Sequence, residues 1–159
     1  MAVRTSTAHK NKILGKNGTD TGADGFRGIY HLSIIDLYSG TQPASADAAP
    51  TGTLLASVTV DGAAYNESNG TNGLQFDAPA AGVIGKPSAA SWEYTGIAAG
   101  TVGWARLRTK GDSKAADGSA TYPRVDFAVG ITSGELRLSV VDLQVGTPGV
   151  ITSVAITQG

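Results

Sequence analysis

The stretch Arg124–Val129, RVDFAV, decides the fold class, because charged or small residues alternate in it with apolar ones. Val125, Phe127 and Val129 would lie on one face of an extended strand. The stretch Glu135–Val140, ELRLSV, repeats this alternation. A period of two is typical of a β-strand that is buried on one face only. We therefore expect both stretches to be strands whose apolar faces line a core and whose charged faces meet solvent.

The same pattern continues outward on both sides and predicts about eight strands in all. The further strands are expected at 28–38, 54–60, 74–84, 91–95, 101–109 and 150–157, separated by clusters of Gly, Pro, Asn and Asp that favour turns. No convincing helix of about ten residues follows residue 28, so a parallel βαβ architecture is not expected. The sequence predicts an all-β fold, an antiparallel β-sandwich of jelly-roll or Ig-like type, with a barrel as the related alternative.

Two apolar doublets interrupt the alternation, Ile34-Ile35 and Val140-Val141. Adjacent residues of a strand point to opposite faces of the sheet. Each doublet therefore predicts a bulge, a bend, or a strand that is covered on both sides.

The composition predicts a folded chain with a thin core. Gly, Ala, Ser and Thr supply 75 of the 159 residues, whereas Leu, Ile, Val and Phe supply 34, and the net charge is −1. This aliphatic share is near the level of about 20% below which chains tend to remain disordered, but such chains also carry a high net charge. Because a thin core buries little apolar area, we expect a homo-oligomer that adds burial between subunits.

The first 27 residues differ in charge from the rest of the chain. Residues 1–27 carry a net charge of +3, and residues 28–159 carry −4. We divide the chain into an N-terminal arm with a Gly/Asp-rich loop, 1–27, and a β domain, 28–159. A short helix is expected at 6–14, with Thr5 or Ser6 as its N-cap. No apolar run approaches the length of about 18 residues that spans a membrane, and none follows the basic arm residues as in a secretory signal.

The usual patterns of catalytic and metal-binding sites are absent. The chain has no Cys, and no Gly-x-Ser-x-Gly elbow accompanies His9 or His31. The scattered carboxylates could form a pair for glycoside cleavage, but solvated strand faces and turn caps explain them better. The Asp-containing runs 20–25 and 112–118 lack the ligand set of a calcium loop. Phosphate-binding glycine motifs are missing, and the charge of the arm is too small to predict nucleic-acid binding. We expect no enzyme activity, no cofactor and no metal.

One aromatic cluster is a candidate site, and it consists of Trp92, Tyr94 and Trp104. Alternating aromatic side chains on a strand can form a platform for sugars, but more often they fill a core that lacks bulk. We expect core positions for the three rings, with a carbohydrate-binding host-attachment module as the alternative.

Residues 38–56, YSGTQPASADAAPTGTLLA, resemble the signature segment of a family of small virion structural proteins of tailed bacteriophages, of the decoration or minor capsid type. The chain is also similar to the family in an arm that stops at Ile13-Leu14-Gly15 and in a Trp, Gly and Arg pattern at 92–106. The resemblance covers most of the chain, and its motifs are structural. One departure is the connection around residues 111–118, which is rich in charged and small residues.

The resemblance implies a structural component of a tailed-phage virion, made in the host bacterial cytoplasm and without an active site. A capsid decoration or cement protein that binds the major capsid protein or other virion proteins is the first expectation, and a tail, collar or neck ring component is the alternative. The arm is the candidate anchor, through basic and apolar side chains that would contact a neighbouring protein: Arg4, His9, Lys10, Lys12, Ile13 and Leu14.

Overall fold

The computed structural model describes residues 3–7, 9, 25–112 and 116–157, and this part of the chain is nearly all β. Its elements, in chain order, are β1 (Arg4–Thr5), α2 (Gly25–Ile29), β2 (Ile34–Ser39), β3 (Leu54–Val60), β4 (Val83–Gly85), β5 (Trp92–Thr95), β6 (Gly100–Arg108), β7 (Arg124–Gly130), β8 (Leu136–Leu138), β9 (Asp142–Leu143) and β10 (Pro148–Thr157).

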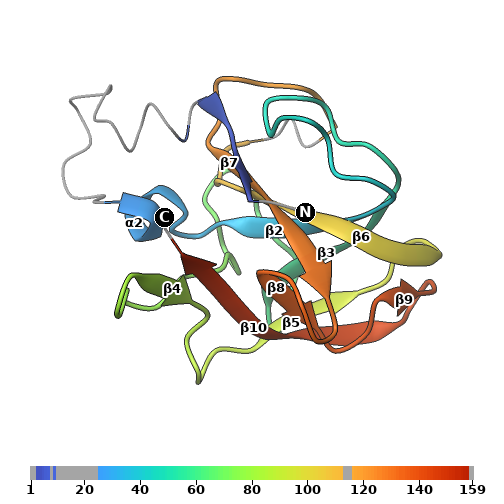
Figure 1. Cartoon of the computed structure of the whole chain (residues 1–159). Coiled ribbons are helices and arrows are strands. Elements are labelled where there is room, and N and C mark those ends of the chain that lie inside the picture. Colours follow the sequence, from blue (N-terminus) through green and yellow to red (C-terminus); the bar gives the residue numbers. More distant parts are fainter. Residues whose placement is uncertain (1–2, 8, 10–24, 113–115, 158–159) are drawn as a thin grey trace.

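Seven of these strands close into a barrel, in the order β7, β8, β10, β5, β3, β2, β6 and back to β7 (Figure 1). Neighbours in the ring are antiparallel except β7 and β8, which are parallel. Three short strands lie outside the ring: β1 pairs with β7, β4 with β10 and β9 with β6. The all-β prediction is confirmed. The predicted β-sandwich, jelly-roll or Ig-like, is not confirmed, because β7 pairs with both β6 and β8 and so joins the edges that two separate sheets would leave open.

Several predicted strands are shorter in the structure than in the sequence pattern. The strand expected at 28–38 begins only at Ile34, because α2 extends to Ile29. The stretch expected at 74–84 contributes β4 and two isolated bridges, at Leu74 and Ala80. The doublet Val140-Val141 lies between β8 and β9, after a bend at Ser139, which is one of the three outcomes that a doublet predicts.

The core fills the inside of the barrel, where the apolar residues of the alternating strands meet. Leu107 of β6 and Val125 and Phe127 of β7 are fully buried there. Aromatic rings supply the bulk that the composition lacks, since Phe76 makes edge contacts with Phe26 and Trp92 at centroid distances of 5.1 and 5.2 Å. The core therefore extends from the barrel to the short helix α2.

Strand β2 is buried on both faces. Ile34 and Ile35 point to opposite sides, yet their exposed fractions are 3% and 0%. The pairing of β2 with β3 and β6 also shifts register on either side of Tyr38. The Ile34-Ile35 doublet thus marks a strand that is covered on both sides.

Candidate functional site

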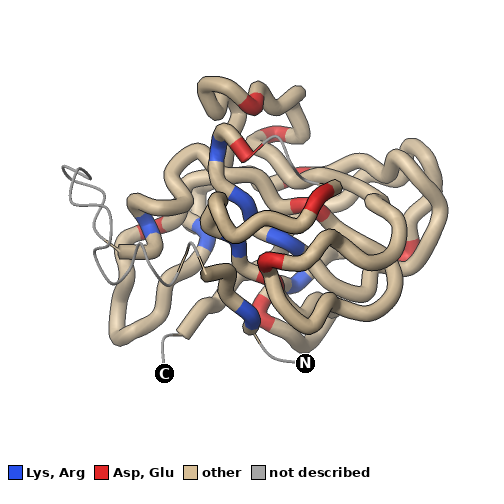
Figure 2. Tube along the Cα trace, turned by 90° about the horizontal axis from the view of Figure 1, so that it is seen from above, with Lys and Arg blue, Asp and Glu red and all other residues tan. Residues whose placement is uncertain are grey.

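The outer face of β2, β6 and β7 carries charged side chains that are buried. Arg106 lies in register between Asp36 of β2 and Asp126 of β7, and Arg108 lies opposite Arg124. Side chains alternate along a strand, so these residues point away from the barrel core that Leu107 and Phe127 fill. We call this set the ionic layer: Asp36, Arg106, Arg108, Asp112, Arg124 and Asp126. In Figure 2 several basic positions lie near the middle of the molecule, with acidic positions around them.

Arg106 and Asp126 form the centre of the ionic layer. The Nε and Nη2 groups of Arg106 donate to the two carboxylate oxygens of Asp126 at 2.7 and 2.8 Å, and both side chains are fully buried. Burial raises the pKa of Asp126 above its usual value, although Arg106 and Arg124 oppose the rise. A two-point contact of this kind fixes the guanidinium plane as well as its charge.

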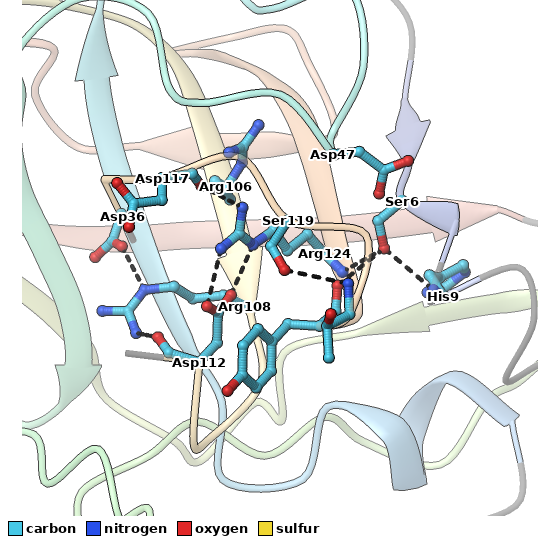
Figure 3. A network of polar contacts seen from close by, with 12 residues as sticks. Ser6, His9, Asp36, Asp47, Arg106, Arg108, Asp112, Asp117, Ser119 and Arg124 are labelled. Atoms are coloured by element: carbon cyan, nitrogen blue, oxygen red, sulfur yellow. Dashed lines mark hydrogen bonds and ion pairs between the residues drawn. The ribbon is translucent and has the colours of Figure 1, made fainter. Parts of the chain in front are cut away.

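Arg124, the first residue of β7, forms the same kind of two-point ion pair with Asp112. The Arg124 Nε and Nη2 groups donate to the carboxylate of Asp112 at 2.7 and 2.9 Å, again with both side chains fully buried. The Nη1 group donates to the carbonyl of Asp117 at 2.8 Å (Figure 3). Both partners of Arg124 belong to the connection between β6 and β7, so this pair holds that connection against the barrel.

Arg108 links the buried layer to the surface. Its Nε group donates to Asp36 at 2.6 Å, and its terminal nitrogens contact Glu67 at 2.7 and 2.8 Å and the Asp112 carbonyl at 2.8 Å. Burial alone would lower the pKa of Arg108, but Glu67 and Asp36 outweigh it and raise the pKa. The Asp36 carboxylate also accepts the Ser57 hydroxyl at 2.6 Å. Glu67 is 40% exposed, so the layer ends in a solvent-facing ion pair.

The loop between β2 and β3, residues 40–53, covers the middle of the layer. Arg106 Nη1 donates to the Ala48 carbonyl at 2.8 Å. Beneath this loop Tyr38 stacks on Trp104 at 4.7 Å, and the Arg106 guanidinium lies 5.2 Å from the Trp104 ring. A side chain at Gly103 would meet the Gly40 carbonyl oxygen at 2.0 Å, so the close passage of the loop over β6 requires glycine there. The loops are thus positioned by backbone carbonyls that accept buried guanidinium groups.

The expectation that the charged faces of the strands meet solvent is wrong for Arg124 and Asp126, which are fully buried. Period two reveals which residues share a face, but it does not reveal what lies on that face. Two signals pointed the other way: the Ile34-Ile35 doublet, and the run Trp104, Arg106, Arg108, in which an aromatic ring shares the face of two charges. The ionic layer is thus a site that the sequence pattern alone did not predict.

The three candidate aromatic residues are all buried, with exposed fractions of 1% or less. Trp92 and Tyr94 belong to the barrel core, and the Tyr94 hydroxyl donates to the Val140 carbonyl at 2.6 Å. Trp104 lies on the opposite side of the barrel wall, under the 40–53 loop. The rings therefore do not share one face, and they present no exposed platform.

Two of the candidate anchoring residues contact other parts of the same chain. Arg4 donates from Nη1 to the Ala44 carbonyl at 2.5 Å, and it belongs to β1. His9 is buried, lies 2.8 Å through Nδ1 from the Tyr30 hydroxyl, and stacks on that ring. Ser6 Oγ accepts the amide of His9 at 3.1 Å, which is the geometry of the predicted N-cap. Lys10, Lys12, Ile13 and Leu14 lie outside the described residues, as does most of the predicted helix 6–14.

Within the described ranges, no group of three His, Asp or Glu side chains is placed to hold a metal ion. No helix in that same part of the chain has the length and apolar character of a membrane span. Comparison with known protein families, with curated proteins and with solved structures finds no match. The function must therefore be inferred from the geometry. Each buried carboxylate of the ionic layer accepts guanidinium or hydroxyl donors, and these contacts fix the loops to the barrel wall.

Proposed function

We propose that this chain is a non-enzymatic structural protein of a tailed-phage virion, most specifically a capsid decoration protein that binds the shell through its N-terminal arm. The observation that carries the proposal is that the charged and aromatic side chains that could bind or react with a ligand are buried in contacts within the chain. Arg106, Arg108 and Arg124 form buried ion pairs, and the Trp rings are buried. A body of this kind suits a scaffold that presents fixed loops.

The position of the family-like segment supports the same proposal. Residues 38–56 comprise the end of β2, the loop over the ionic layer and the start of β3. Within this segment, the Ala48 carbonyl accepts a hydrogen bond from the Arg106 guanidinium. The Asp47 carboxylate accepts hydrogen bonds from the amide and the hydroxyl of Thr7. The segment that carries the resemblance is therefore a structural element, and it holds the arm against the barrel.

The arm residues suited to anchoring are those beyond His9. Arg4 and His9 are engaged within the chain, so we assign the contact with the shell to Lys10, Lys12, Ile13 and Leu14. Their two positive charges match acidic surfaces, and their two aliphatic side chains suit an apolar groove on a neighbouring protein.

The test is binding of the purified chain to capsids that lack it, measured by co-sedimentation. The charge reversal Lys10→Glu with Lys12→Glu should abolish binding, whereas Lys110→Glu, a reversal at an exposed lysine of the body, should leave it unchanged. Equal binding by all three proteins would refute the anchoring role. The copy number in complete virions then separates decoration from the tail, collar or neck alternative, since a decoration protein follows the number of capsid subunits and a ring component does not.

A further inference from the structure

Residues 4–7 occupy a binding site that the rest of the chain forms completely. Arg4 and Thr5 pair with Asp126 and Val125 of β7, and the Ser6 amide donates to the Arg124 carbonyl at 2.9 Å. We call the site the acceptor groove, and it is formed by β7, the Tyr122 carbonyl and residues 44–47 of the loop over the ionic layer.

The acceptor groove forms hydrogen bonds with side chains of residues 4–7 as well as with their backbone. Ser6 Oγ accepts the Arg124 amide at 2.8 Å and donates to the Tyr122 carbonyl at 3.3 Å. The Asp47 carboxylate accepts the Thr7 amide at 2.9 and 3.1 Å and the Thr7 hydroxyl at 2.6 Å. A strand added to a sheet edge with side-chain recognition of this kind is a common way for one protein to bind a segment of another.

The groove does not depend on which chain supplies the segment. Its partners lie 40 or more positions away from the segment in sequence. The connector between His9 and α2, residues 10–24, has 15 residues, enough to span roughly 50 Å if fully extended. A segment that moved to a neighbouring copy would make the same contacts, so the exchange would change the free energy little.

We propose that in the assembled state the acceptor groove binds residues 4–7 of a second copy of this chain, so that neighbouring copies exchange their N-terminal strands. This inference rests on the proposed function in one respect, since a multi-copy assembly supplies the high local concentration. A connector of this length gives the chain's own segment an effective concentration on the order of millimolar, which a neighbour must match. Exchange would join the subunits of the shell without any new contact surface.

The chain contains no Cys, so a single engineered pair reports on exchange. Thr7→Cys and Asp47→Cys are placed in separate chains, the two proteins are unfolded, mixed and refolded at about 1 mM, and disulfides are formed with diamide. Exchange predicts a cross-linked species of twice the chain mass on a non-reducing gel. The same mixture with Asp142→Cys in place of Asp47→Cys, a site on β9, should remain largely uncross-linked.

A chain with both substitutions, T7C/D47C, provides the matched control. At micromolar concentration it should close a disulfide within the chain, which shows that the two positions can pair. If this control closes but the mixed chains stay monomeric at about 1 mM, strand exchange is refuted. The capsid-binding test of Lys10 and Lys12 does not involve the groove, so failure of exchange and failure of the proposed function are separate outcomes.

Discussion

The two faces of β2, β6 and β7 are both buried, but they are built from opposite chemistry. The inner face carries Leu107, Val125 and Phe127 in an apolar core. The outer face carries Arg106, Arg124 and Asp126 in ion pairs beneath loops. Apolar burial is non-directional and stabilises the barrel as a whole. Buried ion pairs add little net stability, because desolvation offsets their attraction, but they fix partners in one geometry. The inner face therefore supplies most of the stability, and the outer face fixes the position of the loops.

The strongest way to break the outer face is Asp126→Ala. It leaves the Arg106 guanidinium buried without its carboxylate, and an uncompensated buried charge costs about 3–5 kcal/mol. We expect that loss in the free energy of unfolding by urea titration, together with faster hydrogen exchange in the 40–53 loop. The double replacement Arg106→Met with Asp126→Leu should recover most of the stability, because it removes both charges, while the loop stays loose.

The matched variant on the inner face is Leu107→Ala, one residue away from Arg106. A cavity at a fully buried leucine costs about 2–5 kcal/mol, so the loss is of similar size. Hydrogen exchange in the 40–53 loop should follow global unfolding and show no selective increase. If both variants loosened the loop equally, the division of roles between the two faces would be wrong.

A smaller effect, the dependence of stability on pH, tests the apolar core at Tyr30. Burial first, and the charge of Asp126 second, raise the pKa of Tyr30 well above 10. Above pH 10 the unfolded chain releases the Tyr30 proton and the folded chain keeps it, so the unfolded state binds fewer protons and stability falls as pH rises. The slope for one such tyrosine is about 1.4 kcal/mol per pH unit, and it ends once pH exceeds the folded pKa.

Tyr30→Phe should remove that part of the slope in unfolding titrations between pH 10 and 11. This variant also loses the hydrogen bond with His9. That loss lowers the free energy of unfolding by a similar amount at every pH, so it displaces the curve without changing its slope. An unchanged slope would show that Tyr30 ionises in the folded protein.

The smallest effect concerns the open end of the ionic layer. Glu67→Gln weakens an ion pair in which the glutamate is 40% exposed, and pairs near solvent contribute about 0.2–1 kcal/mol. The loss should shrink further in high salt. Asp36→Asn removes the other carboxylate of Arg108, which is buried, and should cost more than Glu67→Gln. Equal losses from the two variants would mean that burial does not set the strength of these pairs.

Much of the strand content could be predicted from the sequence, because period two is a local property. The stretch 124–129 became β7, and 54–60 became β3 with the predicted bounds. The boundaries failed at 28–38 and 74–84, where α2 and loop segments replaced part of the pattern. The ionic layer could not be predicted in the same way, since Arg106 finds Asp126 20 positions away and Arg108 finds Asp36 72 positions away. Such pairs depend on strand register, which no local pattern records.

The sequence by itself determined that the chain is all β, and it determined which residues share a face, because neighbouring side chains of a strand must point to opposite sides. Only the tertiary structure decided that the strands close into a ring, that the charged face of β7 lies under loops, and that β1 pairs with β7 outside that ring. The physical reason is that alternation separates the two faces of a strand, whereas the cover of each face comes from segments far away in the chain.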